Sequence, residues 1–299
     1  MTRHGFALIP AGALLALGLA ACGNDTGPSQ SSSILSIAEA DSLGEVVAQD
    51  ADEMVSASDF NSVTGVTLVT PVGAPPHLLH GPPPCNPAVT PNPPTNSDAD
   101  AVPDSARLDF TGCTFSRGNF DFTVSGLIDV IDPSPNVAEF AVRLVFTDFG
   151  RTWTNTQTDR TWSAVHNGSR QVSANADTLG HIINNFITNY TFPDGATATH
   201  VRNWVGRFEA DVPGSIAVDI PLPAGSWTFA GSSTWSKGAR NWSAQTSTTT
   251  ALHYDPSCTV APRFTAGQLF LTVTRHSHIV NVTIDFTGCG QYSVTRTVP

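Results

Sequence analysis

The sequence predicts an all-β fold, an antiparallel meander or sandwich of long strands with one short helix near the N-terminus. Only 13% of the residues are charged. That is about half the usual share, and the Ser, Thr, Asn, Gly and Pro that replace charged residues favour strands and turns. Residues 278–286 alternate apolar and polar with a period of two, as in a sheet with one buried face. Turn-forming pairs such as Asn167-Gly168 separate the apolar runs.

Residues 1–21 have the pattern of a secretory signal peptide, with a basic start and an apolar run too short for a stable membrane span. Leu19-Ala20-Ala21 directly precedes Cys22 and resembles the lipobox of bacterial lipoproteins. That resemblance implies that Cys22 becomes the mature N-terminus and carries acyl chains, which hold the protein at a lipid bilayer. An ordinary cleaved signal peptide followed by an unmodified cysteine is the alternative.

Residues 22–33 form a predicted flexible tether, and residues 34–299 a single β-rich domain. The domain begins with a helix over about 37–56. Ser36 and Glu39 have the spacing of a capping box, and apolar residues follow at helical spacing. We expect the acidic residues of this helix to face solvent.

Residues 71–95 contain ten prolines. This density excludes a helix or a central strand. Because Cys85 lies within the segment, we expect it to be extended and held against the domain.

From Ala106 onward the sequence predicts strands separated by turns. We expect hairpin turns at Asn167-Gly168 and Pro193-Asp194-Gly195. Residues 180–187 fit either a helix or a strand, and we assign a strand. The clearest predicted strands are 119–131, 137–149, 161–166, 169–174, 214–220, 267–275 and 278–286.

Export would place the four cysteines that follow Cys22 in a compartment that permits disulfides. The sequence Asp-Phe-Thr-Gly-Cys occurs twice, and each copy has another cysteine 28 or 31 residues upstream. A repeated unit that closes its own loop predicts the bridges Cys85–Cys113 and Cys258–Cys289. A Cys113–Cys289 bridge between adjacent strand ends is the alternative.

Two tryptophan pairs flank predicted turns symmetrically, Trp153 with Trp162 and Trp235 with Trp242. We favour cross-strand pairing, which places the indoles side by side within the sheet. The functional alternative is a platform on which sugar rings stack.

An acidic segment carries oxygen side chains at alternate positions, Asn96, Asp98, Asp100 and Asp104. Its spacing resembles the calcium loops of the thrombospondin type-3 and EF-hand kind, and the resemblance implies Ca²⁺ as a cofactor held by these four residues. The segment departs from that pattern at Ala101, where glycine is expected, and at Arg107, where an acidic residue is expected. A turn that binds no metal is the alternative.

We predict no catalytic residues and lean toward a protein that is not an enzyme. The chain contains no G-x-S-x-G, H-E-x-x-H, C-x-x-C or G-x-G-x-x-G motif. His276 and His278 have a spacing that some metal sites use, but they fall at a predicted turn without a third ligand. The net charge is −11 at pH 7, and loss of Arg3 with the signal peptide makes it −11 − 1 = −12. Nucleic acid is therefore a poor partner.

The lipobox, tether, acidic helix and Ser/Thr-rich β-domain with two Asp-Phe-Thr-Gly-Cys copies together resemble uncharacterised bacterial lipoproteins. The resemblance implies an exported domain in the bacterial cell envelope, lipid-anchored with the outer membrane favoured. We expect a non-catalytic envelope or binding protein with a protein or glycan partner. Two alternatives are a carbohydrate-binding or glycan-acting β-sandwich protein and a carrier of an apolar ligand.

Overall fold

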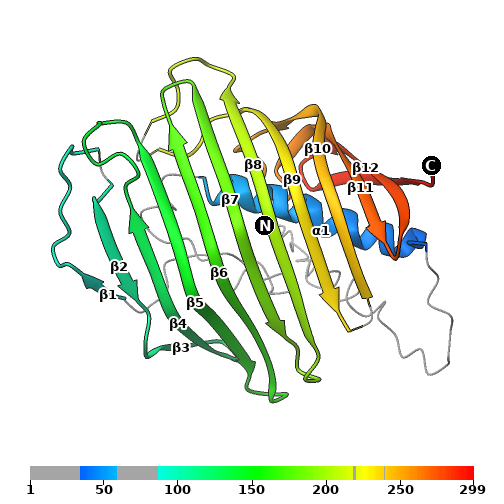
Figure 1. The fold of residues 1–299 in the computed structure, drawn as a ribbon, viewed down its shortest axis with the longest axis horizontal. Coiled ribbons are helices and arrows are strands. Elements are labelled where there is room, and N and C mark those ends of the chain that lie inside the picture. The colour runs from blue at the N-terminus through cyan, green and yellow to red at the C-terminus, as the bar shows by residue number, and fades with distance from the viewer. Residues whose placement is uncertain (1–33, 59–86, 101, 218–219, 239) are drawn as a thin grey trace, which may run out of the picture.

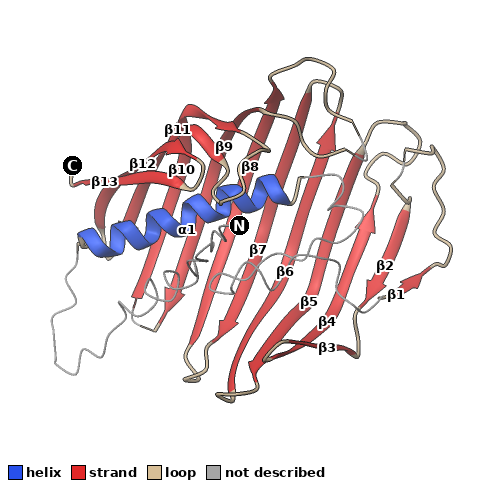
Figure 2. Cartoon of the chain, turned by 180° about the vertical axis from the view of Figure 1, so that it is seen from behind, coloured by secondary structure: helices blue, strands red, loops and turns tan. Residues whose placement is uncertain are grey.

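The computed structural model describes residues 34–58, 87–100, 102–217, 220–238 and 240–299. In this part of the chain, thirteen strands form one antiparallel sheet, and the helix α1 (Ile37–Ser56) lies across one face of it (Figures 1 and 2). The predicted all-β class with one N-terminal helix is confirmed.

The sheet is a meander in which most strands pair with their neighbours in sequence. The order is β1-β2-β4-β5-β6-β7-β8-β9-β10-β11-β12-β13, and β3 pairs with β4. Short turns produce this topology because a tight turn can join only antiparallel neighbours. The strands are β1 (Ala88–Thr90), β2 (Ser105–Asp109), β3 (Cys113–Arg117), β4 (Phe120–Ile131), β5 (Ala141–Asn155), β6 (Arg160–Ala174), β7 (Thr178–Thr191), β8 (Thr197–Ala210), β9 (Gly225–Lys237), β10 (Arg240–Tyr254), β11 (Phe264–Arg275), β12 (His278–Gly288) and β13 (Gln291–Thr297).

The helix begins and ends where the sequence predicts. The backbone N–H of Glu39 donates to Ser36 Oγ at 3.2 Å, and the backbone N–H of Ser36 donates to Glu39 Oε2 at 2.9 Å. These two bonds form the predicted capping box and satisfy amides that the helix itself leaves free. Near the N-terminal end, Gly44 lies so close to β13 that an added Cβ would be 2.6 Å from Val294 Cγ2. At the other end, the carbonyl of Met54 lies 3.1 Å from His181 Nδ1 on β7.

The main apolar core lies between α1 and the sheet. Val280, Val282, Ile284 and Phe286 of β12 are all buried, so the period-two pattern of this strand is confirmed. Full burial of each such side chain contributes about 1.5–3 kcal/mol. The largest fully buried side chains include Trp204, Trp227, Phe186, Phe208 and Phe264.

A row of β-bulges crosses β4 to β7. The pairing register shifts at Ser125/Leu127, Phe146/Phe149, Asn167/Ser169 and Ile183/Phe186. Gly168 has φ +119°, and an added Cβ there would lie 2.3 Å from the carbonyl oxygen of Asn185, so the position requires glycine. Bulges bend strands and increase their twist. Figure 1 shows that the sheet wraps around the helix at the other end, over β10 to β13.

The predicted hairpin turn at Asn167-Gly168 is wrong. β6 runs unbroken from Arg160 to Ala174, and the Asn-Gly pair forms one of the bulges. Asn167 Oδ1 accepts from the backbone N–H of Asp148 at 2.9 Å, which satisfies an amide that the bulge leaves unpaired. The turn at Pro193-Asp194-Gly195 and the strand over 180–187 are both formed as predicted, the latter within β7.

The prediction of a strand over 214–220 is also wrong, because the described residues 214–217 and 220 are not in a strand. The backbone N–H of Gly214 donates to Asp177 Oδ1 at 2.8 Å, and that of Ile216 donates to the carbonyl of Ala176 at 3.1 Å. These amides therefore bond to the β6–β7 turn and not to a neighbouring strand. The strand predicted over 137–149 begins later, at Ala141, and continues to Asn155.

The Cys258–Cys289 disulfide is formed as predicted, with Cα atoms 5.4 Å apart. It excludes the alternative Cys113–Cys289 bridge. Cys113 is also disulfide-bonded, and its pairing with Cys85 stays a prediction because Cys85 lies outside the described residues. The signal peptide, the tether and residues 71–86 lie outside them as well.

Candidate functional site

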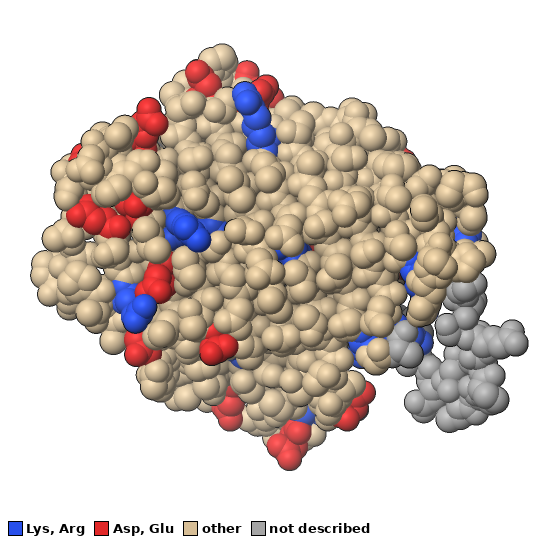
Figure 3. Space-filling view, in the orientation of Figure 1, with Lys and Arg blue, Asp and Glu red and all other residues tan. Residues whose placement is uncertain are grey.

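Buried charges lie on the helix side of the central strands. Arg151 of β5, Arg170 of β6 and Arg202 of β8 are each at most 5% exposed, and α1 places the buried Asp50 and the half-buried Glu53 among them. We call these five residues the buried arginine layer. The opposite face of the sheet carries few charged side chains across its strands (Figure 3).

Two of the three arginines pair with the helix. Arg202 Nη1 lies 2.8 Å from Asp50 Oδ1 and 2.7 Å from Glu53 Oε2. Arg170 Nη2 donates to Glu53 Oε1. The guanidinium groups of Arg170 and Arg202 also lie over the Phe186 ring, 4.4 Å and 5.2 Å from its centroid, respectively. Glu53 therefore bridges two strands, with cation–π contacts beneath the ion pairs.

The two helix carboxylates titrate differently. Burial alone would raise the pKa of Glu53, but the charges of Arg170 and Arg202 hold it far below its ordinary value. Burial raises the pKa of Asp50 to about 7, against the opposing charge of Arg202. The layer therefore holds three guanidinium groups and two helix carboxyl groups.

Arg151 has no hydrogen-bond partner among the described residues. None of its three guanidinium nitrogens is hydrogen-bonded, and its side chain is 5% exposed. Its guanidinium carbon lies over the Phe149 ring, 5.4 Å from the ring centroid. Burial lowers the pKa of Arg151 to about 9, so the group stays charged at pH 7. A buried, unpaired charge is costly, and packing alone does not account for it.

Three neutral histidines border the layer. Burial lowers the pKa of His181 and of His200 to about 3, and it lowers that of His166 well below its ordinary value. His200 Nε2 lies 3.5 Å from Asp50 Oδ2, and His166 Nδ1 lies 3.1 Å from Thr188 Oγ1. Uncharged imidazoles fill this space without adding to the positive charge.

The four predicted tryptophans lie near the β5–β6 and β9–β10 turns, and Trp153 lies two residues beyond Arg151 along β5. Trp153 faces Trp162 across β5 and β6, with parallel rings 6.3 Å apart, and Trp235 faces Trp242 across β9 and β10. Both cross-strand pairs are therefore formed. Trp153 is buried and the other three are half-buried. Their alternative role as a platform for sugar rings stays a prediction.

The residues predicted to bind calcium fall into two groups. Asn96 Oδ1 accepts from the backbone N–H of Ala99 at 2.8 Å, and Asp104 accepts from Ser97 N and Oγ, both at 2.7 Å. These two residues cap the turn. Asp98 and Asp100 instead approach Asp132, and one carboxylate oxygen of each lies within 4.8 Å of the others. Asp132 follows β4, and no local spacing in the sequence points to it.

Among the described residues, these three aspartates form the one group of His, Cys, Asp or Glu side chains close enough to share a metal. His276 and His278 belong to the tight β11–β12 turn, where His276 and Ser277 have positive φ. Both histidines are exposed, and the described structure brings no third ligand to them.

The prediction that the acidic face of the helix is solvated is wrong. Asp50 and Glu53 pair with Arg202 and Arg170, while two further acidic residues, Glu39 and Asp52, pair with Arg275 and Arg263. A signal was present in the sequence. Asp50 lies three residues after Val47 and four before Met54, which places it on the apolar face.

No protein-family model, curated protein or solved structure matches this chain. Among the described residues, no helix has the length and apolar character needed to cross a membrane. The argument for function therefore rests on the sequence and on the buried arginine layer.

Proposed function

We propose that this protein is a non-catalytic binding protein, exported and anchored to a bacterial membrane through an acylated Cys22. Its proposed ligand is an apolar molecule with an anionic group, which binds on the helix side of the sheet. The single observation that supports this ligand class is Arg151, a buried cation whose nitrogens have no hydrogen-bond partner in the described structure.

The charge balance favours an anion. The charge of Glu53 favours the charged form of Arg151, but Asp50 and Glu53 form their ion pairs with Arg170 and Arg202, so neither gives Arg151 a hydrogen bond. A carboxylate or phosphate accepts hydrogen bonds from a guanidinium group in a fixed, often bidentate geometry. Such a group would supply both the missing charge and the missing acceptors.

The surroundings of Arg151 favour an apolar body on that anion. Val124 and Ala164 are its register partners on the adjacent strands. Phe149 and Trp153 lie on either side of it along β5, and Trp153 belongs to an aromatic cluster with Phe122 and Tyr190. These aromatic and aliphatic neighbours are why we favour the carrier alternative over the glycan one.

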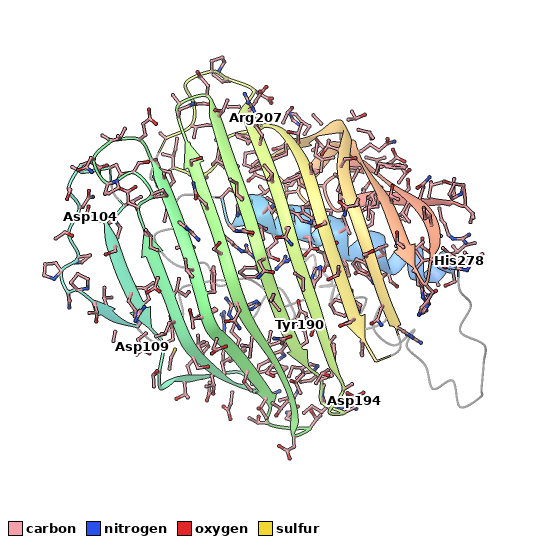
Figure 4. All side chains as sticks on the ribbon, in the orientation of Figure 1. Asp104, Asp109, Tyr190, Asp194, Arg207 and His278 are labelled. Carbon is pink, nitrogen blue, oxygen red and sulfur yellow. A yellow bond between two sulfur atoms is a disulfide. The ribbon has the colours of Figure 1, made fainter. Side chains whose placement is uncertain are left out.

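Oleate binding tests the ligand class. We expect the Cys22→Ala form, which carries no acyl chains, to bind oleate in a fluorescent fatty-acid displacement assay. Arg151→Gln should weaken binding by roughly tenfold or more, because hydrogen bonds to charged groups contribute about 1.5–3 kcal/mol. Arg207→Gln is the matched control, since exposed Arg207 pairs with Glu209 on the strand surface (Figure 4).

Two further ligands test the anionic group and the apolar body of the proposed ligand separately. Inorganic phosphate probes the anion alone, and decanol probes the apolar body alone. We expect each to bind more weakly than oleate. Equal oleate affinity in the wild-type and Arg151→Gln proteins, with unchanged melting temperatures, would contradict the proposed site.

Fractionation tests the anchor. In the natural host, the wild-type chain should partition into the detergent phase, and Cys22→Ala should move the protein to the soluble fraction because it removes the acylated residue. A Cys22→Ala protein that stays membrane-bound would refute lipid attachment at this position.

A further inference from the structure

Three carboxylates that do not belong to the buried arginine layer converge near one edge of the sheet. Asp98 and Asp100 lie in the connection between β1 and β2, and Asp132 directly follows β4. The antiparallel β2–β4 pair brings them together, because Ser105 at the start of β2 is the register partner of Ile131. The backbone N–H of Asp132 also donates to the carbonyl of Asp104 at 3.2 Å.

Each carboxylate uses one oxygen to hold the backbone. Oδ1 of Asp98, Asp100 and Asp132 accepts from the backbone N–H two residues later in the chain, at 3.2, 2.8 and 2.7 Å. These bonds fix the three side chains in place without using their second oxygens.

The second oxygens are shielded and unpaired. Oδ2 of all three aspartates is inaccessible to solvent and has no hydrogen-bond partner. Asp132 is only 3% exposed, so water does not satisfy its free oxygen as it does for an ordinary surface acid. A buried carboxylate oxygen without a partner requires a cation or a proton.

The charges of the cluster are not balanced by basic side chains. None of the ion pairs among the described residues involves Asp98, Asp100 or Asp132. The arrangement is thus electrostatically strained unless a positive charge joins it.

We propose that Asp98, Asp100 and Asp132 bind one calcium ion, which joins the β1–β2 connection to the end of β4. Carboxylate oxygens are the ligands of hard cations, and Ca²⁺ accepts an irregular set that water and backbone carbonyls complete. Zn²⁺ favours nitrogen and sulfur ligands, and Mg²⁺ demands a stricter octahedral geometry. This site differs from the sequence-predicted one, because Asp132 replaces Asn96 and Asp104 as ligand.

Calorimetric titration of the full chain with CaCl₂ tests the site. We expect one ion to bind with Kd of about 10⁻⁴–10⁻³ M, the range of extracellular calcium modules. In 5 mM Ca²⁺, the melting temperature should be roughly 2–8 °C higher than in chelator. The same concentration of Mg²⁺ should produce a smaller shift.

Two isosteric variants distinguish this site from a loop-only site. Asp132→Asn keeps the acceptor for Ser134 but should abolish calcium binding. In chelator it should melt at or above the wild type, because one of three repelling charges is gone. Asp104→Asn should keep calcium binding. Absence of calcium binding by the wild type, or binding lost in Asp104→Asn and retained in Asp132→Asn, would overturn the proposal.

Discussion

The helix meets the sheet in two regions of opposite chemistry. Over β11 and β12, the inward side chains are apolar, among them Leu269, Leu271, Val282 and Ile284. Over β6 and β8, the last turns of the helix place Asp50 and Glu53 between arginines. Apolar packing stabilises without specifying one register, whereas a buried ion pair tolerates only the register in which its partners meet. We infer that the apolar region supplies stability and the charged region fixes the position of the helix.

Removal of one charge in the central region should have the largest effect. Glu53→Gln preserves the size of the side chain but leaves Arg170 and Arg202 with Asp50 as their one helix carboxylate. Breaking a buried ion pair typically costs about 3–5 kcal/mol. Urea denaturation should therefore show a loss of unfolding free energy of about that size.

Ile284→Val in the apolar region is the matched control for Glu53→Gln. It removes one methylene from a fully buried side chain of β12 and should cost about 0.5–1.5 kcal/mol. If Glu53→Gln costs no more than Ile284→Val, the charged region does not depend on its ion pairs and the comparison fails.

The pH dependence of the unfolding free energy should also arise from titratable side chains of the central region. The pKa of His181 is about 3 in the folded chain, below its unfolded value of about 6.5. Acidification from pH 6.5 toward pH 3 therefore protonates His181 in the unfolded chain first. Stability should fall by about 1.4 kcal/mol per pH unit for this one group.

Asp50 acts in the opposite direction. Its pKa is about 7 in the folded chain, above an unfolded value of about 3.9, so acidification through this window stabilises the folded state. The three histidines together outweigh this single acid, and net stability should fall.

Unfolding curves between pH 7 and pH 4 test this dependence. His181→Asn should reduce the slope of unfolding free energy against pH by the contribution of one proton. Equal slopes in His181→Asn and the wild type would show that this histidine does not titrate as described.

The same comparison explains how much of the fold the sequence predicts. β12 and the helix were predicted nearly to the residue, because period-two alternation and a capping box are local patterns. β6 was divided at Asn167-Gly168 because the pair suits both a hairpin turn and a bulge. Only the neighbouring strands β5 and β7 decide between the two.

The candidate sites depend on long-range contacts and could be predicted only in part. The acidic segment near Asp98 was found from its local spacing, but Asp132 reaches it only through the β2–β4 pairing. Arg151 and Arg202 occupy inward positions of strands, where arginine is rare. Their partners are set by where α1 crosses the sheet, which local patterns do not encode.

The smallest effect should come from an ion pair of the same kind at the apolar end of the helix. Arg275 Nη1 donates to Glu39 Oε1 at 2.7 Å, but the Glu39 side chain is 34% exposed. Water and salt therefore screen the pair, and such pairs contribute about 0.2–1 kcal/mol. Glu39→Gln should cost no more than this, since glutamine can still complete the capping box with Ser36. The loss should shrink further in 1 M NaCl, while that of Glu53→Gln should persist. A salt-insensitive loss of several kcal/mol at Glu39 would show that burial does not separate the two regions.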